Sequence, residues 1–193
     1  MLDMTDRYFS STYMKPRPQD WKIDRSGVGH IDFIVVHHSA GWYGNALTDS
    51  SSEGAQIEMI DALAADHTER FGVGPGYHYI IGTTQAFAVG KWGTHRAHTA
   101  GTHEISQVKY NHNSIGICVL GNADKEPITI KQRQLLRHTV DEIIRISGEL
   151  YLPVIGHNEA NVIKSERFPN GRQTTTCPGK YLLPLIWDMD GTV

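Results

Sequence analysis

Cysteine is scarce in this chain, with only Cys118 and Cys177 among 193 residues. At most one disulfide can form, which excludes a small fold that depends on a framework of disulfides. The two thiols have different surroundings. Cys118 lies in an apolar run, residues 114–120, where a thiol packs as a small hydrophobe. Cys177 precedes Pro178 and Gly179 in a polar segment, where reactivity or metal ligation is a more natural role.

An excess of charge of one sign and long hydrophobic runs are also missing. The 18 Lys and Arg nearly balance the 21 Asp and Glu, which gives no reason to expect a nucleic-acid or membrane-surface partner. No apolar run reaches the length of a transmembrane helix, and the N-terminal residues show no signal-peptide pattern. We therefore expect a monomer that is cytoplasmic when made, with no nucleic-acid partner and no insertion into a membrane.

Hydrophobic residues make up 39% of the chain, enough for the core of one domain. Residues 1–30 are rich in Pro, Ser and charge and predict an extended arm on the edge of that domain, which spans residues 31–193. Helical periodicity is found over residues 57–67 and 135–144, and a short helix is expected over 182–187. Apolar, β-branched patterns predict strands, which cover residues 31–37, 77–82, 86–90, 115–120 and 152–155.

The second helix has the clearest boundaries. Thr129 and Gln132 have the spacing of a capping box at its start, and Ser147-Gly148 supplies a stop. Strands that alternate with helices indicate an α/β or α+β fold, in which helices cover a sheet and ligands bind at strand ends and adjoining loops.

Histidine is abundant, with eleven residues, and several lie at the ends of predicted strands. His37-His38 closes the first strand, His78 lies in the second and His157 follows the last, and side chains at strand ends can converge over the sheet. A catalytic zinc site takes three protein ligands, and two imidazoles from strand ends with one thiolate from a loop would supply them. Adjacent strand residues point to opposite faces, so His37 and His38 cannot both face one metal. The alternative for each histidine is a hydrogen-bonded structural role.

Five segments of the chain, taken in order, resemble the zinc amidases that include the phage lysozyme-type endolysins and the peptidoglycan recognition proteins. The resemblance covers about residues 31–188. The segments are Val35-Val36-His37-His38-Ser39-Ala40, Gly76-Tyr77-His78-Tyr79-Ile80-Ile81, Asn111-His112-Asn113-Ser114-Ile115-Gly116-Ile117, Gly156-His157-Asn158-Glu159 and Thr175-Thr176-Cys177-Pro178-Gly179.

This resemblance implies a central mixed sheet flanked by helices, with a zinc ion in an open groove. It selects His37, His157 and Cys177 as the zinc ligands and leaves His38 on the other face of its strand. It also implies a catalytic role for Tyr77, whose alternative is an aromatic residue that fills the core.

Two further residues carry over from the family less directly. His98 matches a histidine of the substrate groove, and an ordinary loop histidine is the alternative. Thr175 stands where the phage lysozyme type has a lysine that polarises the carbonyl, so we expect it to assist catalysis; a plain loop threonine is the alternative. The link over residues 161–174 is longer than in compact members, and its Lys164, Arg167 and Arg172 either contact the acidic stem peptide or belong to a solvated surface loop.

The activity implied by the family is hydrolysis of the amide that joins N-acetylmuramic acid to L-alanine in bacterial peptidoglycan. The expected setting is a phage or prophage endolysin that reaches the cell wall after holin-type release, or a secreted antibacterial effector. A cytoplasmic amidase that recycles anhydro-muropeptides is one alternative, although such enzymes generally have aspartate where Cys177 stands. A non-catalytic peptidoglycan-binding module is another, and those commonly lack the cysteine.

Overall fold

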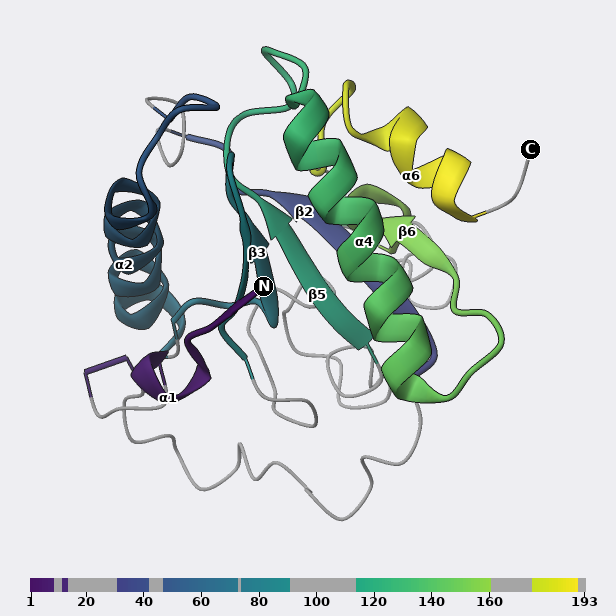
Figure 1. Cartoon of the computed structure of the whole chain (residues 1–193), viewed down its shortest axis with the longest axis horizontal. Helices are drawn as coiled ribbons and strands as arrows, with labels where there is room; N and C mark the ends of the chain where they lie inside the picture. Colours follow the sequence, from purple (N-terminus) through teal and green to yellow (C-terminus); the bar gives the residue numbers. More distant parts are fainter. Residues whose placement is uncertain are drawn as a thin grey trace.

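A six-stranded mixed sheet forms the centre of the molecule (Figure 1). The computed structural model describes residues 1–8, 12–13, 31–41, 47–72, 74–90, 114–160 and 175–190. The sheet has the order β1-β4-β3-β5-β2-β6, and only the pairing of β3 with β4 is antiparallel. Its strands are β1 (Leu2–Asp3), β2 (Phe33–His38), β3 (Tyr79–Ile81), β4 (Ala86–Ala88), β5 (Ser114–Val119) and β6 (Val154–Gly156).

Helices cover both faces of this sheet, as the sequence predicted. They are α1 (Thr5–Tyr8), α2 (Glu53–Phe71), α4 (Ile130–Ser147) and α6 (Leu183–Asp190). Each predicted strand and helix from residue 31 onward overlaps an observed one. The predicted capping box is present, because Thr129 and Gln132 each accept the other's backbone N–H at 3.1 Å. Gly148 ends α4 in the left-handed conformation with φ of 75°.

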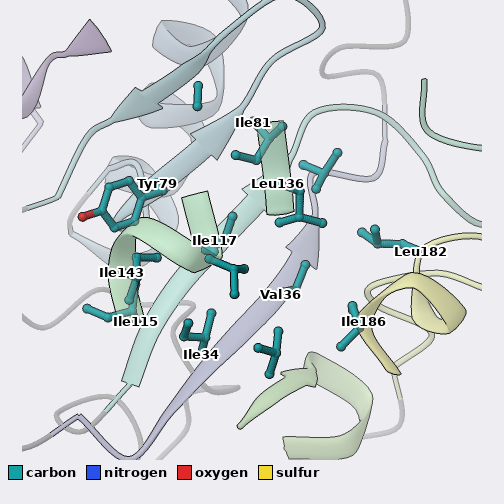
Figure 2. Packing of buried hydrophobic residues seen from close by; sticks show 14 of the residues in the cluster. Ile34, Val36, Tyr79, Ile81, Ile115, Ile117, Leu136, Ile143, Leu182 and Ile186 are labelled. Atoms are coloured by element: carbon teal, nitrogen blue, oxygen red, sulfur yellow. The ribbon is translucent and has the colours of Figure 1, made fainter. Parts of the chain in front are cut away.

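The alternation of side chains along the central strands divides the core into two clusters. One cluster lies between the sheet and the pair α4 and α6; Figure 2 shows Ile34 and Val36 of β2 there beside Leu136 of α4. The other cluster lies against α2 and contains Ile60 and Cys118. Because both faces are covered, the central strands are apolar without alternation.

The N-terminal residues are part of the fold and do more than extend along its edge. β1 pairs in parallel with β4, and Tyr8 of α1 is completely buried in the α2 cluster. The Tyr8 hydroxyl donates to Asp61 of α2 at 2.9 Å, and Arg7 forms an ion pair with the same carboxylate. The sequence predicted contact with the domain edge, but not the strand or the helix. A two-residue strand is held by backbone hydrogen bonds, which leave no periodic pattern of side chains.

The parallel strands β5, β2 and β6 carry their C-terminal ends to the same edge of the sheet. The predicted strand-end histidines lie at this edge. Among the described helices, none combines the length and apolarity that crossing a membrane requires.

Candidate metal centre

Two neighbouring parallel strands bring His37 and His157 together. Val36 of β2 is paired with Gly156 of β6, so the residue that follows each of them lies at the same level of the sheet. The two imidazole rings have their centroids 4.6 Å apart. Cys177 joins them from the loop before α6, with its Sγ 3.7 Å from Nδ1 of His37. One potential ligand atom from each of the three residues lies within 4.8 Å of the others.

The donor set and its spacing fit a zinc ion. Tetrahedral zinc with Zn–N near 2.0–2.1 Å and Zn–S near 2.3 Å separates its ligand atoms by about 3.5 Å. The observed 3.7 Å between sulfur and ring nitrogen is close to that value. Two imidazoles and one thiolate also leave a fourth position for water, as in catalytic zinc sites.

Hydrogen bonds fix the loop that carries Cys177. The Cys177 carbonyl accepts the N–H of Asn158 at 2.7 Å, and its own N–H donates to Oγ1 of Thr175 at 3.1 Å. Gly179 has φ of 95°, and a Cβ there would lie 2.5 Å from the carbonyl carbon of Ala123. This close approach and the positive φ require glycine at position 179. The glycine of the Cys-Pro-Gly segment is therefore explained by the packing of the loop.

Burial raises the pKa of the Cys177 thiol to about 12. A hydrogen bond from the backbone N–H of His38 opposes this shift, and the nearby Asp124 carboxylate adds to it. At neutral pH the thiol is therefore protonated in the metal-free protein and becomes a thiolate only when a cation binds. This environment suits a ligand better than a free nucleophile.

His38 lies on the other face of β2, as the alternation of strand side chains predicted. Its Nδ1 accepts the N–H of Ala123 at 3.1 Å, which ties the strand to the loop before α4. Burial lowers the pKa of His38, so the neutral imidazole that accepts this bond is favoured. His38 thus has the hydrogen-bonded structural role.

Tyr77 is both a core residue and a neighbour of the metal centre. Its side chain is 4% exposed, and its ring centroid lies 5.2 Å from that of His37. Burial, followed by the nearby sulfurs of Cys118 and Cys177, raises the pKa of Tyr77 well above its ordinary value. The phenol therefore stays protonated at neutral pH, so its O–H remains available to donate a hydrogen bond.

Of the remaining residues that the sequence predicted for the site, the structure describes Thr175 alone. Thr175 lies two residues from Cys177 and holds that residue's N–H, a contact that leaves the hydroxyl proton for another acceptor. His98 and the segment 161–174, with Lys164, Arg167 and Arg172, lie outside the described residues.

Two residues near Tyr77 were not identified as functional from the sequence. The sequence predicted a helix that includes His67 and a buried strand that includes Cys118; α2 and β5 confirm both elements, and both residues are buried. The structure adds that the His67 ring lies 5.5 Å from the Tyr77 ring and that Cys118 hydrogen-bonds with the Tyr77 side chain. A histidine on an otherwise apolar helical face was the available signal for His67.

Comparison with known families agrees with this site. The family model described as N-acetylmuramoyl-L-alanine amidase matches residues 27–180, well over half of the chain. The chain belongs to this amidase family. The matched range contains His37, Tyr77, His157 and Cys177. No curated protein matches the sequence.

Solved structures support the same fold at low sequence identity. Peptidoglycan recognition protein SA of bumblebee is 21% identical, with a TM-score of 0.60 over 81% of this chain and 80% of that one. The amidase LysC from Clostridium intestinale is 18% identical, with a TM-score of 0.54 over 86% and 87%. Recognition protein LE, solved with tracheal cytotoxin, is 17% identical, with a TM-score of 0.67 over 97% and 92%. These chains share the mixed sheet and flanking helices of the amidase family.

Proposed function

We propose that the protein is a zinc-dependent N-acetylmuramoyl-L-alanine amidase that cuts the bond between N-acetylmuramic acid and L-alanine in bacterial peptidoglycan. The observation that carries this proposal is the convergence of His37, His157 and Cys177 at one edge of the sheet, beside the buried phenol of Tyr77. Membership of the amidase family supplies the substrate class.

His37, His157 and Cys177 would hold the zinc ion. Zinc bound in this way lowers the pKa of a coordinated water to about 7 and polarises a carbonyl. Cys177 would bind as the thiolate, and its loop is held by Asn158 and Thr175.

Tyr77 would donate a hydrogen bond to the oxygen that gains negative charge as the amide carbonyl becomes tetrahedral. Its high pKa suits this role, since the phenol keeps its proton at neutral pH. Thr175 would provide a second, weaker donor through the proton that its contact with Cys177 leaves available. A neutral hydroxyl stabilises an oxyanion less than a lysine ammonium does.

Digestion of purified sacculi with metal-free and zinc-loaded protein tests the function. Mass spectrometry should find bare glycan and free stem peptides with a new L-alanine amino terminus, and only when zinc is present. Cleavage within the glycan or within the peptide would contradict the proposal. His157→Ala and Cys177→Ser should abolish product, whereas His138→Ala, at an exposed position of α4, should not.

A second candidate function is peptidoglycan binding without cleavage. It is favoured by the likeness to recognition proteins, one of which was solved with tracheal cytotoxin, described as monomeric diaminopimelic acid-type peptidoglycan. Stoichiometric binding to sacculi with no release of L-alanine amino termini would establish it. The presence of all three potential ligands and Tyr77 favours the enzyme.

The biological setting that we propose is a monomeric, bacteriolytic endolysin of a phage or prophage, made in the cytoplasm and acting on the wall after holin-type release. A holin gene beside the coding sequence would support it, whereas a secretion locus would favour an antibacterial effector. Preference for soluble anhydro-muropeptides over sacculi would instead indicate a recycling amidase.

A further inference from the structure

Ring contacts connect helix α2 to the metal centre through Tyr77. The His67 ring lies 5.5 Å from the Tyr77 ring, which lies 5.2 Å from the His37 ring. His67 is 4% exposed and lies in the C-terminal part of α2, four residues before the helix ends at Phe71. These contacts place a buried histidine against the ring of Tyr77, which in turn lies beside His37.

His67 also holds the backbone next to Tyr77. Its Nδ1 accepts the N–H of Gly76 at 3.0 Å. This bond requires an imidazole whose Nδ1 carries no proton. Burial lowers the pKa of His67 to about 4, with a smaller opposing effect of Asp66, so the ring is neutral at neutral pH.

The segment before Tyr77 is tightly packed on α2. A Cβ at Gly74 would lie 1.8 Å from the carbonyl oxygen of Ala64, and the N–H of Gly74 donates to the carbonyl of Tyr13 at 3.0 Å. Thr68, one residue beyond His67, donates to the carbonyls of Ala64 and Tyr13 at 2.7 and 3.2 Å. Helix α2 therefore fixes the path of residues 74–76, and His67 makes the last of these contacts before Tyr77.

We propose that His67 is a positioning residue for Tyr77, which it holds through the backbone of Gly76 and through ring packing. This inference rests on the proposed amidase function, because it assigns His67 a role in setting the phenol against the scissile carbonyl. A small displacement of a catalytic donor is costly to rate, so a contact one residue away can control turnover.

Two substitutions separate the hydrogen bond from the volume of the ring. In His67→Asn the amide oxygen takes the place of Nδ1 as acceptor for Gly76, whereas His67→Leu fills space without an acceptor. With zinc-loaded enzyme and a soluble muropeptide, we expect His67→Leu to lower kcat about 10- to 100-fold with KM nearly unchanged. His67→Asn should recover most of that loss, and zinc content should be equal in all variants. Equal kcat for His67→Leu and the wild type would overturn the proposal.

A double-mutant cycle with Tyr77→Phe tests whether His67 acts through the phenol. The expected result is that His67→Leu lowers the residual rate of Tyr77→Phe by less than threefold, because the group that it positions is already gone. Products can be accumulated over long incubations and read by mass spectrometry. A loss of the same factor in both backgrounds would show a merely structural role.

His78→Leu is a matched control for the removal of a buried imidazole. Nδ1 of His78 also accepts a glycine N–H at 3.0 Å, from Gly116 of the neighbouring strand. We expect this variant to lose thermal stability to a similar degree and to keep kcat closer to the wild type than His67→Leu does. An equal kcat loss in the two variants would contradict a specific role for His67.

Amide hydrogen exchange separates this proposal from the proposed function. The Gly76 amide should be protected in the wild type and in His67→Asn, and should exchange at least tenfold faster in His67→Leu. If zinc-loaded wild-type protein cleaves no peptidoglycan, the amidase proposal fails, but this measurement still reports on the contact. Unchanged Gly76 exchange in His67→Leu would show that His67 does not hold this segment.

Discussion

At the scale of single residues, burial makes His67 a source of pH-dependent stability. Burial lowers its pKa to about 4 in the folded protein, against an ordinary value of 6.5 in the unfolded chain, so the unfolded chain takes up a proton first as the pH falls. The stabilisation is complete above pH 6.5 and is lost between pH 6.5 and 4. We expect a loss of roughly 3 kcal/mol in the free energy of unfolding over this range. Urea unfolding at several pH values gives the free energy of unfolding as a function of pH. Between pH 4 and 6.5 this free energy should change less with pH in His67→Leu than in the wild type.

Thr175 provides a second prediction at this scale, because it holds the backbone of a potential zinc ligand. Thr175→Val removes the oxygen that accepts the Cys177 N–H. We expect the free energy of zinc binding to become less favourable by about 1 kcal/mol, which lowers the zinc affinity about fivefold. Thr175→Ser keeps the acceptor and should bind zinc like the wild type. Competition with a chromophoric chelator measures both. Equal affinities for the Val and Ser variants would show that this contact does not support the ligand.

At the scale of elements, α1 stabilises the domain although it has only four residues. Tyr8 is completely buried against α2, so Tyr8→Ala should leave a cavity and cost about 3–5 kcal/mol in the free energy of unfolding. Tyr8→Phe keeps the ring and loses only the bond to Asp61, which should cost about 1 kcal/mol. Chemical denaturation can compare the two. A small effect of Tyr8→Ala would mean that the N-terminal elements are not required for stability.

The elements differ in how far the sequence specified them. Helix α4 was predicted with its start and its stop, because a capping box and a glycine stop are local signals carried by Thr129, Gln132 and Gly148. β1 and α1 were missed, since their stability comes from pairing with β4 and from contacts with Asp61 of α2. Such contacts join residues more than fifty positions apart and leave no local pattern.

At the scale of the whole molecule, zinc is expected to stabilise the fold as well as to support catalysis. The proposed ligands come from β2, from the end of β6 and from the loop before α6, so an ion at this site would cross-link three parts of the chain. Free zinc at 1,000 times Kd adds about 4 kcal/mol, which corresponds to a rise in Tm of about 10 °C for a domain of this size. Differential scanning calorimetry with zinc and with a chelator measures the shift. Cys177→Ser should lose most of it, and a full shift in that variant would exclude Cys177 as a ligand.

The sequence by itself determined the strands, the main helices and the candidate ligands of this protein. Apolar periodicity specifies elements locally, and the alternation of strand side chains showed that His37 and His38 cannot both face one metal, while the family resemblance selected His37. The tertiary structure decided what surrounds these residues. Parallel pairing of β2 with β6 brings His37 to His157, and the packing of α2 places His67 against the ring of Tyr77. Burial then sets the pKa values of Cys177, Tyr77 and His67, because desolvation depends on neighbours that are distant in the sequence.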